Sequence, residues 1–126
     1  MGLDNYPAKL YPNGEYHRLD PWDQDDGYAI TAMNGTGLRL GSSHVPKYAS
    51  FRGEDYREGL LRITGTDLRE GLILPERVAS MYQAMNGEGA ARLANRWDGL
   101  DEAEYVRLMA WFYVCVQYGY AIKAWK

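Results

Sequence analysis

The segment from Gly41 to Gly53 combines the residue types that most readily bind an anion. It contains small hydroxyl side chains, one histidine, one lysine and one arginine, with tyrosines close by. It runs into a predicted helix near Glu54, and a helix start exposes N–H groups that favour phosphate or carboxylate. Arginine adds a bidentate grip and tyrosine a stacking face. The sequence therefore predicts a ligand-binding site made of Ser42, Ser43, His44, Lys47, Tyr48, Ser50, Arg52 and Tyr56.

The same segment also fits an ordinary polar loop. In this interpretation Ser50 caps the following helix, and Arg52 pairs with Glu54 or Asp55. Both interpretations use the same residue types, so the sequence leaves them open. They differ in whether the guanidinium of Arg52 faces a cavity or a neighbouring carboxylate.

Other patterns that suggest a nucleotide, metal or catalytic site lack the residue spacing that such sites require. The glycine-rich run 34–41 lacks the strand–glycine–helix order of a dinucleotide site and the Lys-Ser or Lys-Thr pair of a P-loop, so it predicts a hairpin turn. The acidic run 20–27 does not match a calcium loop and predicts a solvated loop. His17 and His44 have no metal-ligand spacing, and no G-x-S-x-G elbow occurs. We therefore expect no metal and no cofactor, and a binding protein rather than an enzyme.

Size and composition favour one small globular domain, residues 1–126. The chain is 46% hydrophobic and 25% charged, with a net charge of −3. It has no basic stripe, which argues against duplex nucleic acid as a partner. Cys115 is the only cysteine, so no internal disulfide forms and a reducing compartment is expected. The longest apolar run, 108–116, is too short to cross a bilayer, so we expect a cytoplasmic protein without membrane contact.

The N-terminal part of the chain predicts strands. Residues 6–11 read as a short strand that Pro7 and Pro12 confine to a sheet edge. Residues 28–33 read as a strand, Asn34-Gly35 as a hairpin turn, and residues 38–40 as the return strand.

The remainder of the chain predicts helices. They cover residues 54–63, a stretch that starts at Pro75 and stops at Asn86-Gly87, and residues 90–97. A last helix starts at Asp101 and is apolar nearly all round, which places it at the centre of the core. The expected fold is α+β, with a small N-terminal antiparallel sheet packed against a three- to four-helix C-terminal cluster.

Two segments of the chain resemble a known set of sequences. Met1–Tyr6, and Ser50–Gly53 followed by Tyr56, Thr64-Gly65 and Pro75-Glu76, are similar to small uncharacterised proteins of actinobacteria and their phages. The resemblance implies no established activity. It implies a phage or actinobacterial setting, and through it a role in host–phage conflict.

Three functions are compatible with these patterns. The first is a non-catalytic phage-type protein that binds a small anionic, nucleotide-like ligand and sequesters a host defence signal. The second is an interaction module or inhibitor that docks on a host protein through the acidic N-terminal third and exposed tyrosines. The third is a small enzyme for a phosphorylated substrate, with His44 as general base and Arg52 as anion holder. The aromatic last helix and Trp125 are also compatible with a homo-oligomer.

Overall fold

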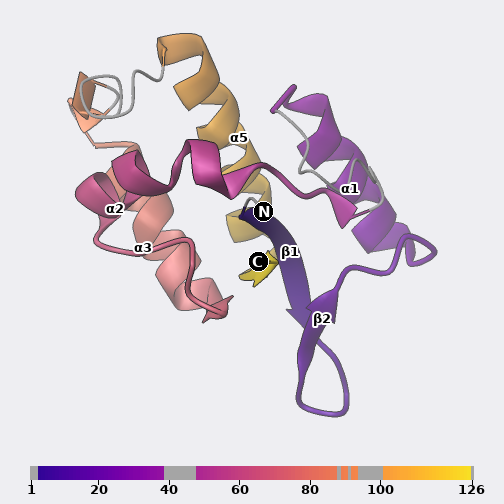
Figure 1. Ribbon diagram of the computed structural model, residues 1–126. Coiled ribbons are helices and arrows are strands. Elements are labelled where there is room, and N and C mark those ends of the chain that lie inside the picture. The colour runs from indigo at the N-terminus through magenta and orange to yellow at the C-terminus, as the bar shows by residue number, and fades with distance from the viewer. Residues whose placement is uncertain (1–2, 39–47, 88, 91, 94–100, 126) are drawn as a thin grey trace.

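The computed structural model describes residues 3–38, 48–87, 89–90, 92–93 and 101–125. Four strands and four α-helices are present in these residues, together with a short 3-10 helix, and they form an α+β fold as predicted (Figure 1). In chain order the elements are β1 (Asp4–Leu10), β2 (Tyr16–Arg18), α1 (Gln24–Gly35), η2 (Gly53–Asp55), α2 (Arg57–Thr64), β3 (Leu72–Ile73), α3 (Pro75–Met85), α5 (Glu102–Tyr118) and β4 (Ala121–Trp125).

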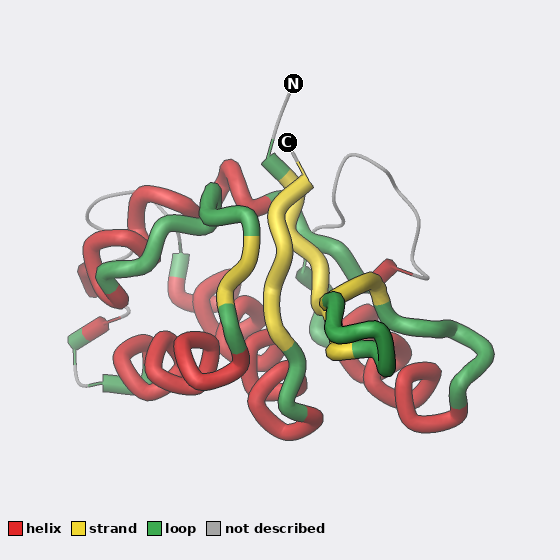
Figure 2. Tube along the Cα trace, turned by 90° about the horizontal axis from the view of Figure 1, so that it is seen from below, coloured by secondary structure: helices red, strands yellow, loops and turns green. Residues whose placement is uncertain are grey.

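The strands form one antiparallel sheet in the order β2-β1-β4-β3. β1 is central: Ala8 pairs with Arg18 of β2, while Asp4 pairs with Trp125 of β4. The first and last strands of the chain therefore lie side by side in the middle of the sheet, as Figure 2 shows. The sequence analysis did not predict β4.

The two faces of the sheet differ in chemistry. Side chains alternate along a strand, so directly paired residues share a face. Ile73 and Ile122 are paired and buried, and they belong to the core that α3 and α5 help to build. The other face carries Tyr6 paired with Lys123, and it also carries Trp125. We call this second side the outer face.

Pro7 lies inside β1, which corrects the prediction that residues 6–11 form an edge strand. Asn5 exchanges two backbone hydrogen bonds with Phe51, on the side of β1 that faces away from β4. Because backbone groups alternate between the two sides of a strand, the nitrogen of Pro7 points the same way as that of Asn5. Pairing with β2 begins only at Ala8, so the missing N–H of Pro7 removes no ladder bond.

Residues 24–35 form a helix, so the predicted strand over 28–33 and its hairpin turn are wrong. The Asp23 side chain accepts a hydrogen bond from the N–H of Asp26 at 3.0 Å and caps α1. Asp26, Ala29, Ile30 and Met33 are buried at helical spacing. The prediction of a solvated acidic loop is wrong for Asp26, which is buried. Of the predicted return strand, residues 39–40 lie outside the described residues.

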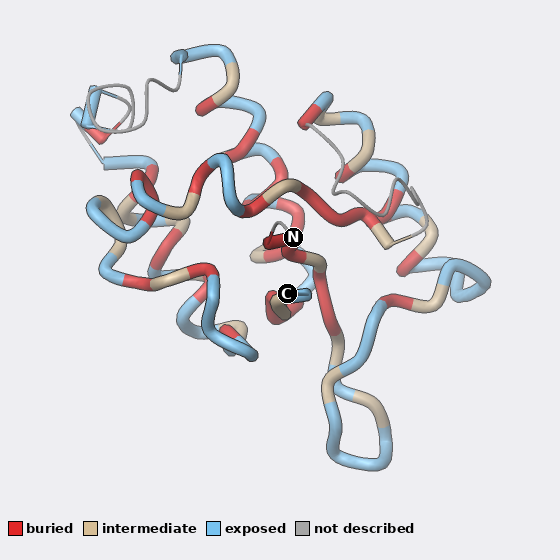
Figure 3. The backbone as a smooth tube through the Cα atoms, viewed as in Figure 1, coloured by how far each residue is buried: buried red, intermediate tan, exposed pale blue. Residues whose placement is uncertain are grey.

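The C-terminal helices agree with the sequence. α2 ends at Thr64 and is capped by Gly65, whose φ of 75° lies in the left-handed region. α3 begins at Pro75. Asp101 caps α5 by accepting a hydrogen bond from the Glu104 N–H at 2.8 Å. α5 buries Leu108, Trp111, Phe112 and Cys115, and its position at the centre of the core is visible in Figure 3. The predicted helix over 90–97 lies partly outside the described residues.

None of the helices in the described residues is both long and apolar enough to cross a membrane.

Candidate functional site

The beginning of β1 is docked on the segment that precedes α2. Asn5 bonds to Phe51 through two backbone hydrogen bonds of 3.0 and 2.8 Å, and the Glu54 N–H donates to the Leu3 carbonyl at 3.1 Å. The Asn5 side chain donates to the Leu68 carbonyl at 2.9 Å and is fully buried. We call these contacts of Leu3, Asn5, Phe51, Gly53 and Leu68 the N-terminal junction.

Gly53 is required at this junction by close packing. A Cβ atom at position 53 would lie 1.8 Å from the Asn5 side-chain oxygen. No larger side chain fits there unless Asn5 moves, and Asn5 is held by its bonds to Phe51 and Leu68.

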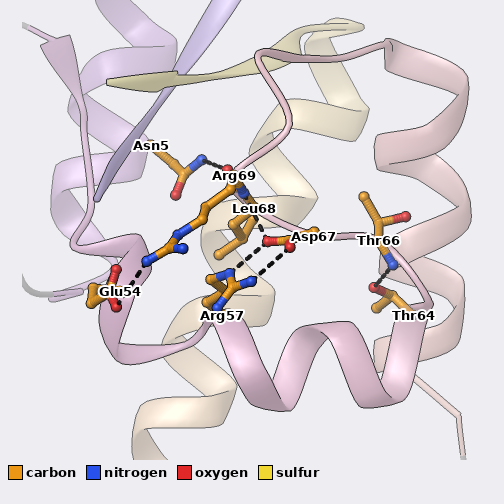
Figure 4. Close-up of polar contacts among 8 residues, drawn as sticks. All are labelled: Asn5, Glu54, Arg57, Thr64, Thr66, Asp67, Leu68 and Arg69. Atoms are coloured by element: carbon orange, nitrogen blue, oxygen red, sulfur yellow. Dashed lines mark hydrogen bonds and ion pairs between the residues drawn. The ribbon is translucent and has the colours of Figure 1, made fainter. Parts of the chain in front are cut away.

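An ion pair anchors the loop that receives Asn5. Arg57 donates two hydrogen bonds to Asp67, at 2.7 and 2.8 Å, as Figure 4 shows. These bonds hold the pKa of Asp67 at about 2, although partial burial acts in the opposite direction. Asp67 also accepts the Arg69 N–H at 3.0 Å. The loop is thereby fixed on both sides of Leu68.

Half of the predicted site residues lie outside the described residues, namely Ser42, Ser43, His44 and Lys47. Ser50 and Tyr56 are buried. Tyr56 packs against Phe51 with ring centroids 5.9 Å apart. The Ser50 hydroxyl makes no hydrogen bond among the described residues, so it does not cap η2. The structure places both side chains in the core rather than at a surface.

Arg52 is half-buried and lies beside a carboxylate. Its Nε is 4.0 Å from the Asp55 Oδ1, the pairing expected of an ordinary polar loop. That Nε makes no hydrogen bond among the described residues. Tyr48 lines a surface hollow at the end of β2, whereas Arg52 does not. The structure therefore does not bring Arg52 and Tyr48 to one site.

A surface hollow of about 1050 Å³ lies where β2 ends and the chain returns at Tyr48. Five of its eleven lining residues are tyrosine or tryptophan. The Trp125 ring meets Tyr6 edge-on at 6.3 Å and Tyr48 edge-on at 6.2 Å between ring centroids. We call this cavity the aromatic hollow; its lining residues are Tyr6, Tyr11, His17, Arg18, Leu19, Asp20, Pro21, Trp22, Tyr48, Ala124 and Trp125.

Arg18 supplies the positive charge of the aromatic hollow. Its guanidinium carbon lies 4.2 Å from the Tyr48 ring centroid and 6.0 Å from that of Trp125, a cation–π arrangement. Within the described part of the chain, no carboxylate oxygen lies within 4.0 Å of the guanidinium nitrogens. The charge of Arg18 is therefore positioned by rings, and no ion pair with a described residue neutralises it.

A strained residue fixes Tyr48 beneath Arg18. Ala49 has a φ of 53°, in the left-handed region that residues with a side chain rarely adopt. The Trp111 indole N–H donates to the Ala49 carbonyl at 2.9 Å and secures this conformation from inside the core. Tyr48 is thus attached to a rigid part of the molecule.

A buried carboxylate fixes the opposite wall of the hollow. Asp26 of α1 forms an ion pair with Lys9 of β1 and accepts hydrogen bonds from the Asp20 N–H at 2.9 Å and the Tyr120 hydroxyl at 2.8 Å. Burial alone raises the pKa of Asp26, but these partners together hold it below its ordinary value. Burial and the neighbouring Asp26 raise the pKa of Tyr120. Asp20, which lines the hollow, is positioned by this network.

The described residues contain no group of three or more metal-ligating side chains. Cys115 is fully buried, and burial raises the pKa of its thiol, so it is a packing residue and not a nucleophile.

Sequence reasoning found Tyr48 but missed Tyr6, Arg18 and Trp125 as members of one site. They come from three strands and meet only through the pairing of β1 with β2 and β4. The surplus of 11 tyrosines and 4 tryptophans was the one signal available. In comparisons with known proteins, no family model, no curated protein and no solved structure matches this chain.

Proposed function

We propose that this protein is a non-catalytic binding module for a small anionic, nucleotide-like ligand, and that the ligand occupies the aromatic hollow. The observation that carries the proposal is the guanidinium of Arg18, held over the Tyr48 ring with no carboxylate partner in the described residues. A nucleotide combines the two features that such a site recognises: a flat ring that stacks on aromatic faces, and a phosphate that pairs with arginine.

The size of the hollow supports this proposal. Small-molecule sites in proteins are mostly apolar concavities with a few polar groups, and their volumes reach about 1000 Å³. The aromatic hollow has this volume, and its lining combines aromatic rings with polar and charged side chains. Tyr48 directly follows the predicted segment Ser42–Lys47 in the sequence, so those residues stay candidates for additional contacts. In the phage setting that the resemblance implies, such a module would sequester a host signal.

Calorimetry tests the proposal with a panel of mononucleotides and cyclic dinucleotides. We expect at least one ligand to bind, and we expect Arg18→Gln to weaken its affinity by at least about tenfold, the usual effect of losing a charged hydrogen bond. Arg92→Gln is the matched control, because Arg92 is exposed and does not line the hollow. Absence of binding across the panel, or equal affinities of Arg18→Gln and wild type, would refute the proposal.

A second candidate function is docking on a protein, and Trp22 favours it. This side chain is 94% exposed at the rim of the hollow, and tryptophan is the residue most enriched at the energetic centre of protein interfaces. Under this function Trp22→Ala abolishes capture of a stoichiometric partner from host lysate, whereas Arg18→Gln leaves capture intact. The opposite result would favour the nucleotide-like ligand.

A further inference from the structure

We propose that the nucleotide-like ligand is a single-stranded nucleic acid, which enters the aromatic hollow and continues across the outer face of the sheet. This inference rests on the proposed function, because both use Arg18 and Tyr48. It goes further by assigning a role to Lys123, which lies outside the hollow.

The register places a second cation on the outer face. Lys123 of β4 pairs directly with Tyr6 of β1, so both side chains project from the same face as Trp125. The Lys123 ammonium donates to the Tyr16 carbonyl of β2 at 3.1 Å, so the side chain crosses over β1. No carboxylate oxygen of the described residues lies within 4.0 Å of this ammonium.

Arg18 and Lys123 therefore form a pair of cations on the outer face, and neither has an ion-pair partner within the described part of the chain. Arg18 pairs with Ala8 of β1, so it projects from the outer face as well. The Arg18 guanidinium lies over Tyr48 and near Trp125 in the hollow, whereas the Lys123 ammonium lies beside Tyr16 and outside the hollow. A ligand that contacts both cations must therefore extend beyond the hollow, as the consecutive phosphates of a single strand do.

Aromatic rings lie beside Arg18 and provide surfaces for bases. Tyr6 and Tyr48 meet Trp125 edge-on, so the rings do not stack on one another. Trp125 is 46% exposed. Proteins bind single strands by combining such rings with cations that follow the phosphates, and a duplex offers no unstacked bases to them. Asp4, the acidic residue of β1 on this face, is 5% exposed.

Fluorescence anisotropy with a labelled oligothymidine of about ten nucleotides tests the inference, because single-strand site sizes are of this order. We expect the strand to bind more tightly than thymidine monophosphate measured by calorimetry. With two phosphates neutralised, we expect its affinity to fall about sevenfold between 50 and 200 mM salt. A duplex of the same length that binds as tightly as the single strand would overturn the inference.

The variant Lys123→Gln separates the inference from the proposed function. It removes the second cation but leaves the aromatic hollow intact, so it should weaken oligonucleotide binding about threefold or more and leave mononucleotide affinity unchanged. Trp125→Leu should weaken oligonucleotide binding by about fivefold or more through lost stacking. Arg92→Gln and Tyr113→Leu are the matched controls, because both residues are exposed and lie outside the sheet.

The outcomes are distinguishable. If the mononucleotide binds and Lys123→Gln has no effect on the oligonucleotide, the inference is wrong and the proposed function stands. If neither ligand binds, both fail. If an acidic peptide binds as tightly as the oligonucleotide, the outer face recognises charge alone, and the assignment to nucleic acid is overturned. Thermal unfolding midpoints of all variants must match wild type for these comparisons to hold.

Discussion

The N-terminal junction and the aromatic hollow share two segments of the chain, the start of β1 and residues 48–53, yet they have opposite character. Asn5 and Tyr6 are neighbours in β1, but Asn5 is fully buried and bonded to Leu68, whereas Tyr6 lines the hollow. In the second segment Phe51 is buried against Asn5, and Tyr48 lies under Arg18. Alternation along a strand sends adjacent side chains to opposite faces, so one short segment serves two purposes.

The comparison shows which residues should govern stability and which should govern binding. The junction is held together by backbone hydrogen bonds, by the side-chain amide donor of Asn5 and by a glycine without room for a Cβ. At the hollow the rings meet edge-on and the cation has no acidic partner in the described residues. Changes at the junction should therefore unfold the protein, and changes at the hollow should leave it folded but unable to bind.

Gly53→Ala is expected to have the largest effect. The added methyl group would lie 1.8 Å from the Asn5 side-chain oxygen, and overpacking of this kind costs about 3 kcal/mol of unfolding free energy. Urea denaturation measures the loss. Gly71→Ala is the matched control, because nothing lies within 4 Å of the added Cβ and the change should be below about 0.5 kcal/mol. Equal stabilities of the two variants would show that the junction is not closely packed.

Asn5→Ala should have the next largest effect. It removes the donor to the buried Leu68 carbonyl, and a buried polar group left without a partner costs about 2 kcal/mol. Chemical denaturation of Asn5→Ala beside Asn86→Ala gives the comparison, because Asn86 is exposed at the end of α3. If both variants lose the same stability, the side-chain bond to Leu68 contributes nothing.

Arg18→Gln should show the opposite pattern. Losing the contacts of the guanidinium with Tyr48 and Trp125 should lower the unfolding free energy by less than about 1 kcal/mol. The same variant should lose at least about tenfold in ligand affinity. Parallel denaturation and calorimetry check both expectations. A large loss of stability would mean that Arg18 is a structural residue, and the contrast between the two regions would disappear.

Acid should weaken the junction by the smallest amount. Arg57 lowers the pKa of Asp67 from 3.8 to about 2, so Asp67 stays ionised to a lower pH in the folded protein than in the unfolded chain. Its contribution to stability is complete above pH 3.8 and is lost as the pH falls toward about 2. Denaturation midpoints of wild type and Asp67→Asn should differ at neutral pH and converge across this interval. If the difference between the two midpoints stayed constant down to pH 2, protonation of Asp67 would not be the cause of the acid sensitivity.

The sequence predicted the helices better than the sheet, and the reasons are physical. α3 and α5 carry their own signals, Pro75 at a helix start and Asp101 as a cap. Residues 28–33 were predicted as a strand because they form a short, mainly apolar run and Asn34-Gly35 imitates a hairpin turn. The signal for α1 was the Asp23 cap with the buried spacing of Ala29, Ile30 and Met33.

β4 and the hollow depend on pairings that no local pattern reveals. β4 has five residues, and it is a strand because β1 and β3 lie on either side of it. Tyr6, Arg18 and Trp125 then become neighbours although they are far apart in the chain. Of the predicted site, Tyr48 lies at the hollow and Arg52 beside Asp55. The assignments of Ser42, Ser43, His44 and Lys47 stay predictions.

The pairing of β1 with β4 has a consequence for how this protein acquires activity. The two strands are separated by nearly the whole chain, so closing this contact carries a large entropy cost, and we expect it to form late in folding. Before β4 pairs with β1, Trp125 does not complete the hollow and Lys123 does not lie over the outer face. Under the proposed function, a partly folded chain is therefore expected not to bind, and binding competence would mark the last step of maturation.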